Sequence, residues 1–244
     1  MNETFTFNGV NSADHGVYIS GAGTYNSPER VVEMIAVPGR NGAIAMDEGR
    51  FENINVTYPA FMAGTDQADF TDRLAAFRGA ILSAIGYKRL EDDYHPDEFR
   101  LGVYRSGLEV DPKIYNRAGE FELVFDCKPQ RFLKSGEAAV TFTSSGTITN
   151  PTAFPAKSLL RVYGTGYFAI GDYWMNITAN VSSGTYIALE TLQAYAINGG
   201  AISTRGEYVN IGNQAPELVP GVNEITIPAA TITSIEIVPR WWRI

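Results

Sequence analysis

Polar and apolar residues alternate from the start of the chain. Thr4-Phe5-Thr6-Phe7 puts both phenylalanines on one face of an extended segment, and Asn8-Gly9 follows as a turn. Alternation or a short apolar run predicts further strands at residues 16–19, 30–37, 52–58, 87–90, 99–104, 109–110 and 120–125. The first half of the chain is therefore predicted to be rich in short strands.

One segment in this half changes to the helical period. Between residues 66 and 85 an apolar residue recurs every three or four positions, which predicts one helix with a single buried stripe: Phe70, Leu74, Phe77, Ile81 and Ile85. Thr65 and Asp66 are candidate N-caps, and Gly86 is a candidate stop. We expect this helix to lie on the β-rich part of the first half.

The second half has no helical stripe. Residues alternate at period two at 140–142, 160–163, 173–178, 186–189, 225–227 and 232–238, and Ser-Gly, Asn-Gly-Gly and Pro-Gly turns separate them. Seven or eight short strands in about 110 residues are typical of an antiparallel sandwich or jelly roll. The fold class predicted for the whole chain is mainly β.

Charge density divides the chain into two predicted domains. Residues 1–134 carry 14 Lys/Arg and 20 Asp/Glu, whereas residues 135–244 carry only 5 and 7. The change falls in a segment with a proline and a Ser-Gly pair, the composition of a domain junction. We therefore expect an N-terminal domain at 1–134 and a C-terminal domain at 135–244.

Composition excludes several classes of protein. A net charge of −8 argues against a nucleic-acid-binding face. A single cysteine excludes an internal disulfide framework, and no apolar run is long enough to span a membrane. The N-terminal residues lack the pattern of a secretory signal, so we expect a soluble protein made in a reducing cytoplasm.

No motif for catalysis, cofactor binding or metal binding stands out. The two histidines, His15 and His95, match no zinc spacing, and no nucleophile elbow, Walker loop or dinucleotide-binding motif is present. The acidic run 91–98 could in principle hold Ca²⁺, but it joins two predicted strands and is interpreted as a solvated hairpin tip. Cys127 continues an alternating segment, which predicts a small buried strand residue. The sequence thus predicts no enzyme, no cofactor and no metal.

Aromatic residues are the strongest candidates for surface recognition. At 173–178 the alternation places Trp174, Asn176 and Thr178 on the polar face, where an exposed indole could stack on a sugar ring or a partner protein. The alternative is that Trp174 is covered by a neighbouring loop. Trp241 and Trp242 must point to opposite faces if extended, so one is expected in the core and the other at the surface.

Five segments together resemble one family. They are the opening from Phe5 to Ile19, the element Pro38-Gly39-Arg40-Asn41-Gly42, the junction from Phe125 to Phe132, the stretch from Asn150 to Gly166 and the ending from Ser234 to Trp242. In this order, and over nearly the whole chain, they resemble the distal tail protein family of long-tailed bacteriophages.

The resemblance implies an architecture and a role. It implies an N-terminal β-sandwich-like domain with a helix and a hairpin that builds a homo-hexameric ring, and a peripheral galectin-like sandwich. The ring would sit at the virion tail tip after assembly in the bacterial cytoplasm, between the tail tube protein and the tail-associated lysin or fibre hub. Six copies at −8 carry −48, so DNA would pass through the channel without specific binding. Gly39, Arg40, Asn41 and Gly42 are the predicted oligomer contact, with Arg40 offering a fork to a neighbouring carboxylate.

Two alternatives differ in class. The C-terminal sandwich could be a lectin-like adsorption module that recognises a cell-wall glycan. A receptor-binding protein belongs instead to the tail-tip hypothesis, as a further partner of the ring that the resemblance allows. An enzyme such as a glycosidase would need a pair of placed carboxylates, and the 27 acidic residues suggest no particular pair.

Overall fold

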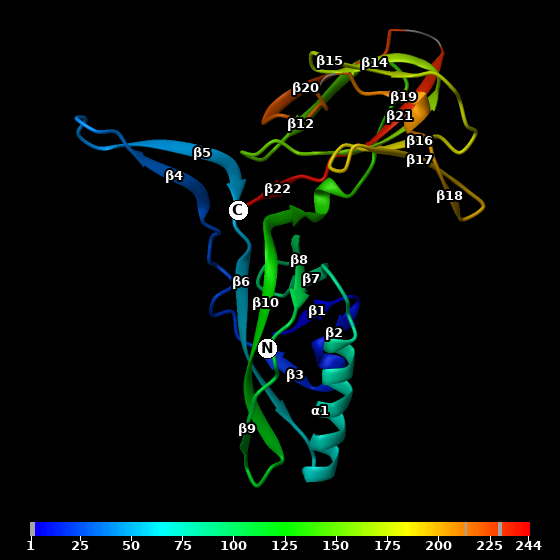
Figure 1. Cartoon of the computed structure of the whole chain (residues 1–244). Coiled ribbons are helices and arrows are strands. Elements are labelled where there is room, and N and C mark those ends of the chain that lie inside the picture. The colour runs from blue at the N-terminus through cyan, green and yellow to red at the C-terminus, as the bar shows by residue number, and fades with distance from the viewer. Residues whose placement is uncertain (1–2, 213, 229–230) are drawn as a thin grey trace. The chain divides into compact units, whose positions relative to one another are not determined.

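A computed structural model describes residues 3–212, 214–228 and 231–244 of the chain (Figure 1). The chain forms two compact units that divide between Arg131 and Phe132. We call them unit 1 and unit 2. Both are built mainly from strands, and the described residues contain one α-helix, so the predicted mainly-β fold class is confirmed.

Unit 1 contains a curved sheet with the strand order β2-β1-β7-β8-β10-β6-β3, and β9 pairs antiparallel with the start of β10. Its strands are β1 (Phe5–Phe7), β2 (Val10–Asn11), β3 (Val17–Ile19), β6 (Ile54–Ala63), β7 (Lys88–Asp92), β8 (Glu98–Tyr104), β9 (Val110–Lys113) and β10 (Ala118–Leu133). A short 3₁₀-helix, η1 (Ser12–His15), joins β2 to β3. The long strands β6 and β10 pair over ten residues, from Ala63 opposite Ala118 to Ile54 opposite Cys127.

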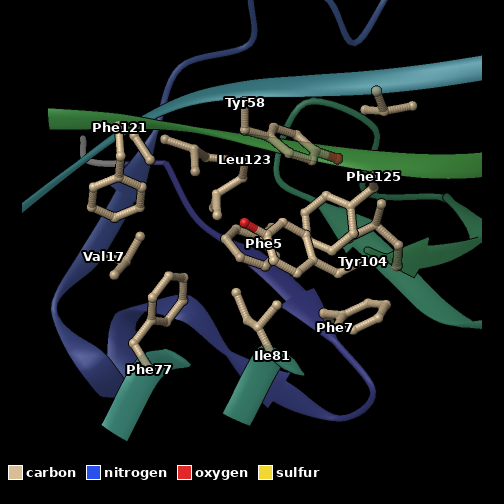
Figure 2. Close-up of a cluster of buried hydrophobic side chains, with 14 of the residues drawn as sticks. Phe5, Phe7, Val17, Tyr58, Phe77, Ile81, Tyr104, Phe121, Leu123 and Phe125 are labelled. Atoms are coloured by element: carbon tan, nitrogen blue, oxygen red, sulfur yellow. The ribbon is translucent and has the colours of Figure 1, made fainter. Parts of the chain in front are cut away.

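The core of unit 1 follows from the alternation in these two strands. On β6 every second residue from Ile54 to Met62 is buried, and on β10 the same holds from Gly119 to Cys127. An aromatic cluster fills the space between the sheet and the helix (Figure 2). The Phe5 ring, for example, lies 5.6 Å from both Tyr58 and Phe125. Burial of these aromatic rings stabilises unit 1.

Helix α1 (Gln67–Leu82) lies where the periodicity placed it, and its four buried residues are Phe70, Leu74, Phe77 and Ile81. The Asp66 carboxylate caps it by accepting a hydrogen bond from the Asp69 N–H at 2.9 Å. The prediction was wrong at the C-terminal end, because Ile85 is 88% exposed. The helix ends at Leu82 and Gly86 takes a positive φ of 74°, so Ile85 no longer lies on the helical stripe.

A two-stranded hairpin stands apart from the sheet of unit 1. Strands β4 (Arg30–Ala36) and β5 (Ala43–Phe51) pair only with each other among the described strands. The sequence predicted β4 and a turn at Pro38–Gly42, but it assigned no strand to residues 43–51, so β5 is an addition. We call residues 30–51 the arm.

Unit 2 consists of two antiparallel sheets that enclose one core. The first has the order β11-β21-β13-β16-β17-β18, and the second has the order β12-β20-β14-β15-β19. The strands are β11 (Val140–Phe142), β12 (Gly146–Asn150), β13 (Leu159–Gly164), β14 (Gly166–Ile170), β15 (Tyr173–Ile177), β16 (Thr185–Ala188), β17 (Gln193–Asn198), β18 (Ala201–Thr204), β19 (Val209–Asn210), β20 (Gly221–Thr226), β21 (Ile232–Val238) and β22 (Trp242–Arg243). Two 3₁₀-helices, η2 (Lys134–Gly136) and η3 (Gly206–Tyr208), complete it.

The two C-terminal tryptophans divide as predicted. Trp241 is buried in the core of unit 2, whereas Trp242 is half-buried and its indole N–H donates to the Pro155 carbonyl at 2.8 Å. Trp242 also stacks on Phe154, with the ring centroids 4.5 Å apart. The period-two geometry of an extended segment accounts for this division. A galectin-like relationship for this sandwich stays a prediction.

Candidate assembly surfaces

The arm exposes apolar side chains on both of its faces. Directly paired residues share a face, so Ile35, Ile44 and Met46 lie on one side. Val32 and Met34 lie on the other side with three alanines. Met34 is 63% exposed and Met46 is 53% exposed. Neither face of the arm is covered by a core formed by the described residues.

Ion pairs hold the base of the arm. The Arg30 Nε donates to the Asp47 carboxylate at 2.8 Å, and this contact lowers the pKa of Asp47 and raises the pKa of Arg30. Arg50 pairs with Glu48 at 3.0 Å and with Glu52 at 2.8 Å. These pairs are solvated and contribute little stability, and only the Arg30–Asp47 pair joins the two strands of the arm.

The predicted contact residues Gly39, Arg40, Asn41 and Gly42 form the tip of the arm and are all exposed. Gly39 and Gly42 have φ values of 78° and 79°, a conformation that favours glycine and makes the turn narrow. Arg40 has no ion-pair partner among the described residues of its own chain. The tip therefore presents one free guanidinium on a narrow turn.

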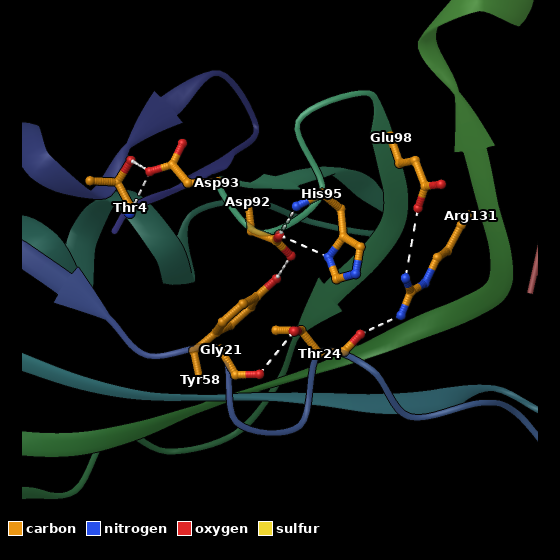
Figure 3. Close-up of polar contacts among 9 residues, drawn as sticks. All are labelled: Thr4, Gly21, Thr24, Tyr58, Asp92, Asp93, His95, Glu98 and Arg131. Carbon is orange, nitrogen blue, oxygen red and sulfur yellow. Dashed lines mark hydrogen bonds and ion pairs between the residues drawn. The ribbon is translucent and has the colours of Figure 1, made fainter. Parts of the chain in front are cut away.

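The acidic run 91–98 is a hairpin turn, as predicted, but it is not a solvated tip. The Asp92 carboxylate accepts a hydrogen bond from the Tyr58 hydroxyl at 2.8 Å and another from the His95 N–H at 2.9 Å (Figure 3). Glu98 is only 3% exposed. Burial, followed by the nearby Asp92 charge, raises the pKa of Tyr58 well above its usual value. The cluster closes the turn against the sheet.

Arg131 is the long-range partner that keeps this turn buried. One of its nitrogens lies 3.7 Å from the Glu98 carboxylate, and another donates to the Thr24 carbonyl (Figure 3). Arg100 lies in the same region, and burial, together with the neighbouring Arg131, lowers its pKa. Buried charges persist only when they are paired, so this cluster fixes the end of β10 to the β7–β8 turn.

Cys127 is buried on β10, as predicted. Burial raises the pKa of its thiol to about 12. A protonated thiol is a poor nucleophile and a poor metal ligand, so the Cys127 side chain acts as a small apolar residue.

The residues of the predicted aromatic platform lie on and just after β15. Trp174 is 49% exposed, so no loop covers it. Asn176 lies on the same face, but Thr178 lies beyond the strand end and its hydroxyl donates to the Tyr208 carbonyl at 3.3 Å. The strand pairing adds Tyr167, which is opposite Asn176 and 59% exposed.

No three His, Cys, Asp or Glu side chains in residues 3–212, 214–228 and 231–244 are placed to hold a metal ion. In the same ranges no helix has the length and apolar character needed to cross a membrane.

Comparison with known proteins identifies the fold. No protein-family model matches the chain, and no curated protein matches it. The crystal structure described as SPP1 Dit (gp 19.1), a paradigm of the hub adsorption apparatus in phages that infect Gram-positive bacteria, aligns with a TM-score of 0.73 and 13% identity. The alignment covers 97% of this chain and 98% of that one. The chain has the fold of SPP1 Dit.

Two phage p2 baseplate structures, both in the activated conformation, share the Dit fold less closely. The strontium form aligns with a TM-score of 0.55 and 8% identity, over 100% of this chain and 98% of that one. The calcium form aligns with a TM-score of 0.56 and 9% identity, over 97% and 98%. The predicted resemblance to phage distal tail proteins is thus confirmed at the level of the fold.

Sequence reasoning missed two features of these surfaces. The apolar residues of β5 were missed because small residues interrupt the pattern, although Ala43 to Met46 after a Gly-Arg-Asn-Gly turn is a detectable hairpin signal. The burial of Glu98 depends on Arg131, which is distant in the sequence, so the residues around Glu98 do not indicate it.

Proposed function

We propose that this protein is a structural component of the tail tip of a long-tailed bacteriophage, where six copies form a ring. The ring joins the tail tube protein to the tail-associated lysin or fibre hub, and DNA passes through its channel. The Dit fold supports this proposal at the level of architecture. The single observation that carries it is the arm, which has apolar residues exposed on both faces.

An isolated two-stranded hairpin is at best marginally stable in water. The arm has a long pairing but no core, and its exposed edges would pair with other chains. Such an element becomes stable when other chains cover it. An assembly in which the arm lies between neighbouring subunits supplies that cover.

Unit 1 is the part that closes the ring in this proposal. It carries the arm, and residues 1–134 hold 34 of the 46 charged side chains. Charge complementarity fixes orientation and register at polar interfaces. Unit 2, with a low charge density, then lies at the periphery and meets other tail-tip proteins.

The net charge of −8 per chain supports the channel role. A strongly negative ring repels the phosphate backbone, so DNA slides through without being held.

Mass measurement and imaging test the proposal. Multi-angle light scattering is expected to give about 160 kDa, which is six chains of 26.7 kDa, and negative-stain images are expected to contain six-fold rings. The fragment 1–134 is expected to associate, because the arm and the sheet of unit 1 lie within it. A monomer at every concentration, or association of unit 2 alone, would contradict the assignment.

A second candidate function is glycan recognition by unit 2. It is favoured by the exposed pair Trp174 and Tyr167, which lie diagonally across β14 and β15 beside Asn176. The platform has no histidine and few charges, so we expect no useful affinity for simple sugars from a single copy. Calorimetric titration of the full chain with cell-wall glycans is the test. Specific binding that disappears in Trp174→Ala would make adsorption the leading function.

A further inference from the structure

A groove crosses the outer surface of the sheet in unit 1. Its volume is about 790 Å³, and it runs over β6 and β10 toward β9. Phe61 lies in it and is 44% exposed, and Pro59 and Val110 contribute further apolar surface. No element of the described chain fills it.

The rim of this groove is acidic. Glu109, Asp111, Glu120 and Glu122 all line it. Lys113 neutralises part of the charge, since its ammonium lies 2.6 Å from Asp111 and 3.8 Å from Glu120. Glu109 and Glu122 have no ion-pair partner among the described residues. The groove is therefore an apolar floor with uncompensated carboxylates at its edge.

The tip of the arm has the complementary chemistry. Val37 and Pro38 precede the turn, and Arg40 projects the free guanidinium. A side chain added at Gly39 or Gly42 would meet no atom of its own chain within 4 Å, so the turn is open on those sides. A guanidinium forms its strongest pairs with carboxylates by two parallel hydrogen bonds.

Groove and tip are distinct surfaces of one chain. The arm joins β6 just before Ile54, whereas the groove lies beside Pro59 and Phe61 near the other end of that strand. At about 3.3 Å per residue this places the groove roughly 15–25 Å along β6 from the base of the arm. Two different, complementary patches on the same chain are what a head-to-tail ring requires.

We propose that the arm tip of one copy inserts into the acidic groove of the next copy, with Arg40 pairing with Glu122 and its carboxylate neighbours. This inference rests on the proposed ring and names the acceptor surface for the arm. Each copy both donates a tip and offers a groove, so the proposed ring needs only this one kind of interface.

Charge exchange in the full chain is the first experiment. Arg40→Glu and Glu122→Arg are each expected to weaken self-association by about tenfold or more, measured by sedimentation velocity. The double variant is expected to recover most of the loss, because the pair is restored with reversed sign. Asp97→Arg is the matched control: it makes the same charge change on the exposed β7–β8 turn, outside the groove, and should leave association unchanged.

Cross-linking locates the contact directly. Cys127 is fully buried, so introduced cysteines are the only ones that react readily. Mixing Arg40→Cys with Glu122→Cys and adding a short bismaleimide is expected to give covalent dimers, and the double-cysteine chain is expected to give a ladder up to hexamer. Mixing Arg40→Cys with Asp97→Cys should give neither product.

The outcomes separate this inference from the proposed function. If the wild-type chain forms rings but the double charge variant associates no more strongly than the single variants, the tip does not meet this groove. The same conclusion follows if Arg40→Cys cross-links to Asp97→Cys as well as it does to Glu122→Cys. It also follows if Arg40→Cys and Glu122→Cys give no cross-link although their mixture assembles to the wild-type mass. If the wild-type chain is monomeric at every concentration, the ring itself is refuted.

Discussion

Truncation of Phe77 measures how much of unit 1 depends on the helix. The side chain is 2% exposed, and its ring lies 5.9 Å from Phe121 and 6.4 Å from Phe5. Phe77→Ala removes these contacts and leaves a cavity that the rigid sheet cannot close. The expected loss is about 3–5 kcal/mol of unfolding free energy. Such a loss is a large fraction of the total stability of a domain, so much of the variant is expected to be insoluble.

The assay uses probes that report on separate units. All three tryptophans lie in unit 2, whereas the one described α-helix lies in unit 1. In urea at fixed protein concentration, the circular dichroism transition at the helical wavelength should move to lower urea by roughly 1–3 M. The tryptophan fluorescence transition should stay in place.

Two further variants complete this test. Leu82→Ala, on the same helix but 54% exposed, is the control and should cost less than about 1 kcal/mol. Ile81→Val, a milder change at a buried position, should cost about 0.5–1.5 kcal/mol and keep the protein soluble. Wild-type-like unfolding of both Phe77→Ala and Ile81→Val would mean that the apolar stripe faces a partner instead of the sheet.

Three other predictions concern single sites. Burial raises the pKa of the Cys127 thiol to about 12 in the folded chain, so folding favours the protonated thiol. The stability that Cys127 contributes to the folded state is therefore fully present below about pH 9 and is lost as the pH rises toward 12. Cys127→Ala should therefore flatten the fall of unfolding free energy in that window by up to about 4 kcal/mol in urea titrations, and an unchanged slope would contradict the burial argument. Asp66→Ala should cost about 1 kcal/mol in the same assay because it removes the N-cap, whereas a loss under about 0.3 kcal/mol would mean that the cap is dispensable. Arg131→Met should cost several kcal/mol because it removes the guanidinium that lies 3.7 Å from the buried Glu98 carboxylate and donates to the Thr24 carbonyl, and near-neutral behaviour would mean that these contacts do not fix the end of β10.

The elements that could be predicted from the sequence are those that depend on local periodicity. The stripe from Phe70 to Ile81 repeats at the helical period, and the alternation at Phe5 and Phe7 repeats at the strand period. Burial of Cys127 followed from the same alternation. Side-chain direction is set by backbone geometry over a few residues, so these patterns need no knowledge of distant partners.

Tertiary structure alone decided the features that join distant segments. Glu98 is buried because Arg131, from another strand, provides the opposite charge. Tyr167 lies beside the Trp174 platform because of the register between β14 and β15. The arm and the groove are separate parts of unit 1, and their complementary charges become apparent only when the exposure of each is known. Burial, register and surface shape depend on which segments pack together, and residue periodicity carries no information about that choice.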